Sequence, residues 1–281
     1  MRILVLGAGG QLGRELVQAT TSHEVVGLTR AECDIAEPGA ASRALEQSRP
    51  DAVVNCAAWT KVDAAEEHRD EAFRANAEGP RLLAEACADA RVLLCHISTD
   101  YVFDGTATAP IPEDAPTHPL GVYGESKLAG EEAIRAVDGR HQIVRTSWLY
   151  GQDGPNFVLT MLRLGAERDE LRVVADQRGA PTWTGHLAPA LLRLVELGQT
   201  GTYHLTSGGE TTWCEFARAI MDAAGLGARV EPTTTAEYGA PAPRPAYSVL
   251  DNAAWRASGE PPLPDWRDAL GRYLQERCAT R

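Results

Sequence analysis

Short apolar runs alternate with segments of helical spacing through the first half of this sequence. The runs predict strands at residues 3–6, 24–28, 52–56, 92–97 and 143–146, and the segments between them predict helices at residues 11–19, 40–47, 70–88 and 127–137. Strands that are apolar along their whole length are typical of a parallel sheet covered by helices on both faces. The pattern therefore predicts an α/β fold with a doubly wound (Rossmann) parallel sheet.

The pattern changes after about residue 151. It predicts helices at residues 157–167, 187–197 and 212–224, short strands at 171–174 and 202–205, and a helix from about residue 265. We expect residues 1–150 to form the Rossmann domain, with some later segments returning to it. Residues 151–281 are expected to form a smaller, mixed α/β lobe that is interleaved with this domain. The proline-rich stretch at residues 106–120 predicts an ordered surface loop, long enough to be functional.

The composition narrows the class of protein. The formal net charge is -12 at pH 7 and no basic block stands out, which argues against a nucleic-acid partner. No apolar run is long enough to cross a bilayer, and the first residues lack the pattern of a signal peptide. The cysteines are scattered without CxxC spacing, which fits a reducing compartment. We therefore expect a cytoplasmic protein without a membrane or nucleic-acid partner.

Three glycines lie between the first predicted strand and the first predicted helix. Gly7 permits a tight turn, Gly10 lets the backbone approach a pyrophosphate, and Gly13 allows close packing of the helix on the sheet. The backbone N–H groups that open the helix, those of Gln11 and Leu12, would then face the phosphates. This spacing at the first strand predicts a dinucleotide cofactor.

The ends of the next two strands predict the rest of the cofactor site. Arg30 follows the second strand and could hold a 2′-phosphate, which favours NADPH. Two alternatives remain open: Arg30 is a solvated loop residue, or Glu32 holds a free 2′-hydroxyl and the cofactor is NADH. Asp34-Ile35 lies where the chain can reach the adenine. The small residues Ala57-Ala58 would let the backbone pass close to the ribose and the phosphates.

A second group of residues has the chemistry of a carbonyl reductase. Thr99 follows the strand at residues 92–97, at the sheet edge where ligands bind, and can hydrogen-bond a carbonyl oxygen. Tyr123 and Lys127 are four residues apart and share a helical face. We expect the Lys127 ammonium to lower the pKa of Tyr123, which would make Tyr123 a general acid for an oxygen becoming an alkoxide. Lys127 can also hold the nicotinamide ribose.

Five segments carry a resemblance to a known family. They are residues 55–63, 98–105, 123–127, 145–151 and 176–182. Together with the glycine turn, they are similar in order and spacing to the dTDP-4-dehydrorhamnose reductases of the extended short-chain dehydrogenase/reductase superfamily. The resemblance covers essentially the whole chain.

The resemblance implies a reaction and a set of contacts. The enzyme would reduce C4 of dTDP-4-dehydro-6-deoxy-L-mannose with NADPH or NADH, with Tyr123 as the general acid, and release dTDP-L-rhamnose. The segment at residues 177–183 would help to hold the nucleotide end. Some members form a homodimer with interface glutamates around Mg²⁺, and Glu15 is a candidate counterpart, although a solvated Glu15 is the simpler interpretation. The residues expected to contact substrate are Val62, Thr99, Asp100, Tyr101, Val102, Tyr123, Trp148 and Trp183.

Other interpretations fit the same residues. Trp148 and Trp183 could be core aromatics, and Tyr101 and Val102 could be packing residues; His96, inside an apolar run, is expected to be structural. Nucleotide-sugar epimerases share the glycine turn and the Tyr/Lys pair, and another deoxysugar 4-ketoreductase would share all of these residues. A dinucleotide-binding regulatory subunit without turnover is the alternative from a different class.

Overall fold

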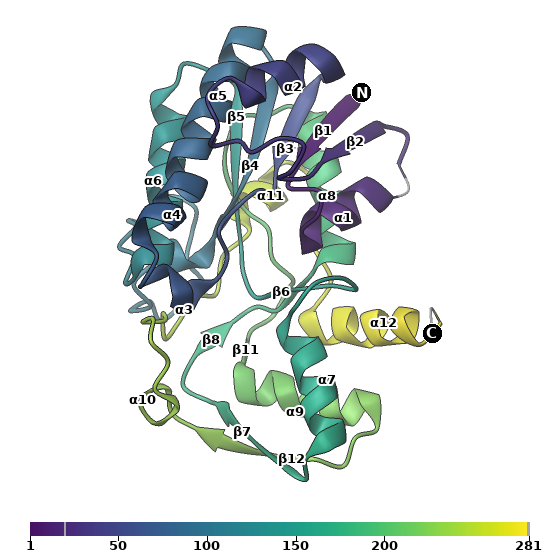
Figure 1. The fold of residues 1–281 in the computed structure, drawn as a ribbon. Helices are drawn as coiled ribbons and strands as arrows, with labels where there is room; N and C mark the ends of the chain where they lie inside the picture. The colour runs from purple at the N-terminus through teal and green to yellow at the C-terminus, as the bar shows by residue number, and fades with distance from the viewer. Residues whose placement is uncertain (20, 280–281) are drawn as a thin grey trace.

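The computed structural model describes residues 1–19 and 21–279 and is centred on a six-stranded parallel sheet (Figure 1). The strand order is β10-β5-β4-β3-β1-β2. This arrangement confirms the predicted Rossmann-type α/β fold. The strands are β1 (Arg2–Leu6), β2 (Glu24–Leu28), β3 (Ala52–Asn55), β4 (Leu93–Thr99), β5 (His141–Thr146) and β10 (Gly201–His204).

Helices cover both faces of this sheet, which explains the continuously apolar strands. Alternate residues of β1 point to opposite faces, so that Ile3 packs with α1 (Gln11–Gln18) and α8 (Thr184–Leu197). Leu4 packs on the other face, against α2 (Ala40–Ser48) and α5 (Gly79–Ala90). Both faces of each strand are therefore removed from water.

The order in which the chain adds strands to the sheet reverses next to β1. From β1 it passes to β2 at one edge, and β3 then pairs on the other side of β1. The connections that leave β1 and β3 therefore diverge at the carboxyl edge of the sheet. Ligands of doubly wound folds bind at such a switch point.

Two predicted helices have different bounds in the structure. The predicted helix at residues 70–88 is divided into α4 (Arg69–Phe73), a π-helical turn (Arg74–Glu78) and α5. The helix expected to begin at residue 127 is α6 (Val122–Ala136), so that Tyr123 lies in its first turn. The first turn of α6 packs directly against the backbone of Tyr101 because Gly124 has no side chain. A Cβ at this position would overlap the carbonyl of Tyr101.

A second group of elements lies at the carboxyl edge of the sheet, in the lower half of Figure 1. Their shared core contains Tyr150, Trp183, Phe216 and Trp266. The elements are β6 (Leu149–Tyr150), α7 (Phe157–Glu167), β7 (Glu170–Val174), β8 (Arg178–Gly179), β9 (Thr182–Trp183), β11 (Thr211–Thr212), α9 (Trp213–Ala224), β12 (Arg229–Thr233), α10 (Thr235–Tyr238) and α12 (Trp266–Ala279).

Some later segments lie with the large sheet: β10 extends it beside β5, α8 packs on α1, and α11 (Ala253–Ala257) lies near β10. The short helices α3 (Val62–Ala65) and η2 (Asp100–Val102) lie in the connections at the carboxyl edge. Residues 280–281, the end of the predicted second lobe, are outside the described residues. Among helices in the described residues, none combines the length and apolar character that a membrane span requires.

Candidate active site

The predicted phosphate turn connects β1 to α1 and is shaped by its glycines. Gly7 has φ +79°, and a Cβ at this position would lie 2.6 Å from the backbone nitrogen of Ala57. Gly10 precedes α1 in an extended conformation, and no side chain caps the helix. The first N–H groups of α1 are therefore left for a ligand, and an anion there would also be stabilised by the helix dipole.

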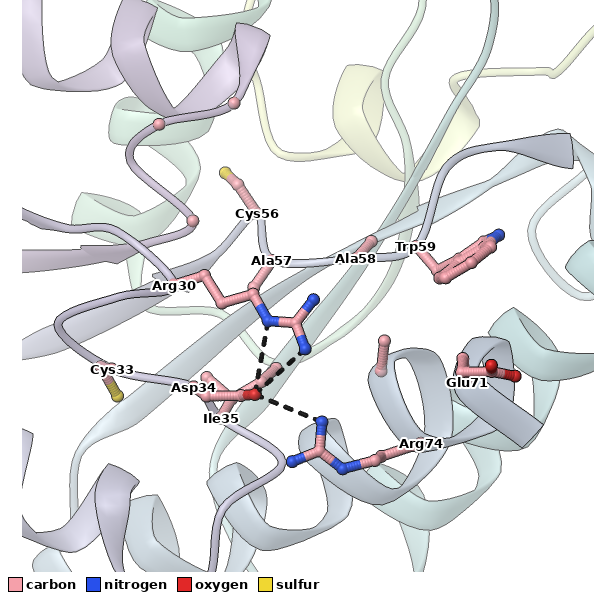
Figure 2. Close-up of a pocket in the computed structure, with 14 residues that line it drawn as sticks. Arg30, Cys33, Asp34, Ile35, Cys56, Ala57, Ala58, Trp59, Glu71 and Arg74 are labelled. Carbon is pink, nitrogen blue, oxygen red and sulfur yellow. Dashed lines mark hydrogen bonds and ion pairs between the residues drawn. The ribbon is translucent and has the colours of Figure 1, made fainter. Parts of the chain in front are cut away.

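A cavity of about 310 Å³ extends from this turn along the carboxyl ends of β1, β2 and β3 (Figure 2). Seven predicted cofactor residues line it: Gly7, Gly10, Arg30, Asp34, Ile35, Ala57 and Ala58. The residues that the sequence did not single out are Gly9, Cys33, Cys56, Trp59, Glu71, Arg74 and Ala75. Size, position and glycine lining fit an extended nucleotide cofactor.

Four predicted cofactor residues do not line this cavity: Gln11, Leu12, Tyr123 and Lys127. The Gln11 side chain accepts a hydrogen bond from Nδ2 of Asn156, with 3.1 Å between the two atoms. The Leu12 side chain is buried in the hydrophobic core. Contacts from Gln11 and Leu12 to a cofactor would therefore come from their backbone N–H groups.

The far end of the cavity carries two guanidinium groups. Figure 2 shows Arg30 and Arg74 converging on one oxygen of Asp34, at 3.3 and 3.2 Å. Burial opposes ionisation of Asp34, but hydrogen bonds from the Ala36 N–H and from Arg74 hold its pKa below the usual value. Arg74 also pairs with Glu37. These groups can bind a phosphate or the polar edge of a base.

Sequence reasoning missed Arg74 because it lies inside the predicted helix at residues 70–88. The structure places it at the start of the π-helical turn, which interrupts that helix. Such turns are common at functional sites. Glu32, the alternative ribose partner, accepts hydrogen bonds from the backbone N–H and hydroxyl of Thr29 and stabilises its own loop.

The predicted catalytic residues, Thr99, Tyr123 and Lys127, lie beside this cavity. Thr99 ends β4, and its hydroxyl hydrogen-bonds Asp100 at 3.1 Å. Tyr123, in the first turn of α6, packs edge-to-face against the ring of Tyr101. Burial raises the pKa of Tyr123 to about 12, although its hydrogen bond with Thr99 acts in the opposite direction. The lowered pKa predicted from the Tyr/Lys spacing is therefore wrong for this arrangement.

Lys127 shares a helical face with Tyr123, but its amine is held by β4. Its Nζ donates to the Ile97 carbonyl oxygen at 2.7 Å and lies 3.3 Å from Nε2 of His96. The side chain is almost fully buried, and this burial lowers the pKa of Lys127 to about 8. Helical spacing correctly placed the two residues on one face, but the contacts of the amine depend on the neighbouring strand.

Asn55 and His96 connect the Lys127 amine to the cofactor loop, the segment after β3 in which Ala57 and Ala58 line the cavity. Nδ2 of Asn55 lies 3.0 Å from Nδ1 of His96, and Oδ1 of Asn55 accepts from the Ala57 N–H at 3.1 Å. Both side chains are completely buried. His96, expected to be structural, is therefore adjacent to the predicted catalytic lysine.

Asp100 is the predicted substrate residue with the most unusual environment. It is 1% exposed, and its Oδ2 has no hydrogen-bond partner among the described residues. Burial raises the pKa of Asp100 to about 6. Proximity of this carboxyl group also raises the pKa of Tyr123, so the two ionisations oppose each other.

The remaining predicted substrate residues divide into two groups. Val102 packs with Phe103, Ile111 and Leu250, and Trp183 is 3% exposed within the second core. Both side chains are buried in hydrophobic clusters, so contacts from these two residues to substrate stay a prediction and would come from their backbone. The side chains of Val62, Tyr101 and Trp148 are only partly buried.

Trp148 has a strained backbone and an aromatic partner. Its φ is +48°, a conformation that is costly for a residue with a Cβ and that often occurs at functional sites. Its ring stacks on Trp213, with 3.5 Å between ring centroids. A Cβ at Gly179 would overlap the same ring. Trp213 carried no sequence signal, because it lies far away along the chain in an ordinary amphipathic helix.

The predicted metal residue has no cluster around it. An Oε2 of Glu15 lies 3.3 Å from the hydroxyl of Thr184, and burial raises the pKa of Glu15. Within the described residues, no group of three or more His, Cys, Asp and Glu side chains could hold a metal ion. A Mg²⁺ site between two protomers, with Glu15 as one ligand, stays a prediction.

Comparisons with known proteins agree with this geometry. The family model of the RmlD substrate binding domain matches residues 1–278. The dTDP-4-dehydrorhamnose reductase of Streptomyces griseus is 46% identical, over 99% of this chain and 94% of that protein. A probable dTDP-4,6-dihydroxy-2-methyloxan-3-one 4-ketoreductase of Streptomyces antibioticus is also 46% identical, over 96% of this chain and 93% of that protein.

A solved structure extends the likeness to the whole fold. The dTDP-4-dehydrorhamnose reductase of Bacillus anthracis, crystallised in complex with NADP, has a TM-score of 0.96 and 39% identity, and the match covers 98% of this chain and 99% of that one. The chain belongs to the RmlD family, the dTDP-4-dehydrorhamnose reductases of the extended short-chain dehydrogenase/reductase superfamily.

Proposed function

We propose that this protein reduces the C4 ketone of dTDP-4-dehydro-6-deoxy-L-mannose with NADPH and forms dTDP-L-rhamnose. One observation carries the proposal: the glycine-lined cavity and the group of Thr99, Tyr123 and Lys127 lie together at the carboxyl edge of one sheet. The names of its relatives specify the sugar. NADPH is favoured over NADH because Arg30 and Arg74 can both reach a 2′-phosphate.

The cavity determines how the cofactor would be held. Gly7 and Gly10 let the backbone approach the pyrophosphate, while the N-terminus of α1 stabilises its charge. The guanidinium groups of Arg30 and Arg74 would bind the 2′-phosphate, and their ion pairs with Asp34 hold them at the cavity. When bound, the reduced nicotinamide supplies the hydride for C4.

The protein residues supply the proton and the orientation. The hydroxyl of Thr99 holds the C4 oxygen, and Tyr123, which is protonated at neutral pH because its pKa is about 12, gives its proton to that oxygen. The ammonium form of Lys127, four residues along the same helix, would offset part of the burial cost of the phenolate that Tyr123 becomes. Val62, Asp100, Tyr101 and Trp148 would contact the sugar. General acid catalysis of this kind contributes ~10²–10⁴-fold.

The proposal includes the division of the chain at about residue 150. A binding role for residues 1–150 is supported by the cavity, which is lined entirely by residues of that segment. A substrate-binding role for residues 151–281 is supported by Trp148 and Trp213, which stack across the boundary. A homodimer in the cytoplasm is the expected form of the protein.

Reduction of the C4 ketone of a different deoxysugar is the main alternative to this function. The Streptomyces antibioticus relative is as similar as the rhamnose-forming one, so the same site could act on a different deoxysugar. The choice depends on how the sugar is presented to Tyr123, which determines the configuration of the product at C4.

The test is to incubate the full chain with NADPH and with dTDP-4-dehydro-6-deoxy-L-mannose prepared enzymatically from dTDP-glucose. We expect NADPH oxidation with equimolar formation of dTDP-L-rhamnose, identified by NMR. NADPH oxidation with a C4 epimer as product would favour the second candidate. No oxidation despite measurable NADPH binding would contradict both and point to another keto sugar or to a binding subunit.

A further inference from the structure

The contacts around His96 form an ordered chain that starts at the cofactor loop. The backbone N–H of Ala57 can only donate, and it donates to Oδ1 of Asn55. This contact fixes the orientation of the Asn55 amide, so that its Nδ2 faces Nδ1 of His96 at 3.0 Å. Since Nδ2 is a donor, Nδ1 must accept. The proton of a neutral His96 ring is therefore on Nε2.

His96 is neutral because it has no access to water. Its side chain is 0% exposed, and burial together with the neighbouring Lys127 keeps its pKa well below the usual value. A neutral ring with its proton on Nε2 points an N–H group at the Lys127 amine, 3.3 Å away. An ammonium group has no lone pair to accept this hydrogen bond, whereas a neutral amine has one.

The other groups around Lys127 do not reverse this preference. The Ile97 carbonyl accepts from Nζ in either protonation state. Glu131, one helical turn further along α6, favours the charged amine, but its carboxylate is already paired with Arg145 and Arg135 and hydrogen-bonded by Ser98. The nearby thiol of Cys56 is neutral, because burial raises its pKa to about 12.

We propose that His96 is a positioning residue that presents its Nε2–H to the Lys127 amine and thereby lowers the pH at which Lys127 releases its proton. Lys127 is then an amine that changes charge slightly above neutral pH, in place of a permanent cation. The final consequence rests on the proposed function: reduction requires the ammonium form, so turnover falls as pH rises through the value at which Lys127 titrates. Asn55 supports this arrangement because it fixes which ring nitrogen of His96 carries the proton.

The sequence makes the proposal directly measurable. Lys61 and Lys127 are the only lysines in the chain, and Lys61 is exposed. Enzyme labelled with ¹³C and ¹⁵N in lysine therefore gives two side-chain signals, one of which is an internal reference. Enzyme labelled with ¹⁵N in histidine reports through one-bond N–H coupling which ring nitrogen carries the proton. Neither measurement needs substrate or turnover.

In the unmodified protein we expect the His96 proton on Nε2 and the titration of Lys127 near pH 8. His96→Phe removes the N–H group and keeps a ring of similar shape. We expect it to move the titration of Lys127 upward by about one pH unit, because one hydrogen bond that favoured the neutral amine is lost. The control is His186→Phe, which removes a partly buried histidine of α8 whose ring packs against Trp183; it should leave the titration of Lys127 unchanged.

The same variants are then compared in the reduction assay. The fall of kcat at high pH should move upward in His96→Phe by as much as the Lys127 titration moves, which a purely structural role of His96 would not cause. A His96 proton on Nδ1, a doubly protonated ring, or a Lys127 titration that His96→Phe leaves unchanged would overturn the proposal. If His96→Phe does not fold, the measurements on the unmodified protein decide. Absence of turnover with normal titrations would contradict the proposed function alone.

Discussion

The cofactor cavity and the catalytic group (Thr99, Tyr123 and Lys127) lie at the same edge of the sheet but consist of different kinds of residue. The cavity consists of glycines, alanines and exposed charges, and Arg30 is 76% exposed. The catalytic group consists of titratable side chains enclosed by protein, and Lys127 is 2% exposed. At the first site the backbone provides the recognition, whereas at the second the protonation states depend on buried neighbours.

The difference suggests how each region responds to change. A substitution in the cavity alters shape or charge at a surface and should affect cofactor binding. A substitution in the catalytic group changes a proton donor or its protonation state. It should affect kcat and leave cofactor binding unchanged.

Tyr123→Phe should lower kcat for reduction by ~10²–10⁴-fold, because the general acid is removed while the ring is kept. NADPH affinity, measured by fluorescence titration, should remain within a few-fold of the original value. Tyr203→Phe removes a phenol hydroxyl from β10 that donates to the Gln199 carbonyl oxygen and should leave kcat unchanged. A Tyr123→Phe enzyme with nearly full kcat would remove Tyr123 from the mechanism.

Gly7→Ala should weaken NADPH binding by ~10–100-fold and also destabilise the fold. The new Cβ would lie 2.6 Å from the Ala57 nitrogen, in a backbone conformation with φ +79° that itself costs ~1–2 kcal/mol.

Gly239→Ala is the matched control for Gly7→Ala. Gly239 has φ +66°, but a Cβ added there would meet no atom of the described residues within 4 Å. The substitution should cost only the conformational strain and leave cofactor binding intact. The readouts are urea unfolding and cofactor titration. Equal effects of the two substitutions on binding would contradict a specific role for the turn.

Arg74→Ala and Arg30→Ala should each weaken NADPH binding by ~10-fold, since a charge-assisted hydrogen bond contributes ~1.5–3 kcal/mol. NADH binding should change little, because NADH has no 2′-phosphate. Arg163→Ala removes an exposed arginine that pairs with Glu167 on α7 and serves as the control. The ratio of the two dissociation constants is the measurement, and an unchanged ratio in both variants would count against the phosphate role.

Periodicity predicted the sheet because each strand must be apolar on both faces, and the glycine turn was recognisable because its spacing has a local steric cause. Helix bounds were less accurate. The start of α6 at Val122 depends on close packing of Gly124 against the Tyr101 carbonyl, and the π-helical turn at Arg74 interrupts a stretch with good helical spacing. Both depend on contacts between segments distant along the chain.

The Rossmann-type sheet, the phosphate turn and the Tyr123/Lys127 spacing follow from the amino-acid sequence alone, because each results from the local geometry of a strand, a turn or a helix. Which side chains meet depends on the tertiary structure. It placed Arg74 beside Asp34, buried Val102 and Trp183 in hydrophobic cores, and brought His96 to the Lys127 amine. Burial, which local sequence does not specify, then raised the pKa of Tyr123 and lowered that of Lys127.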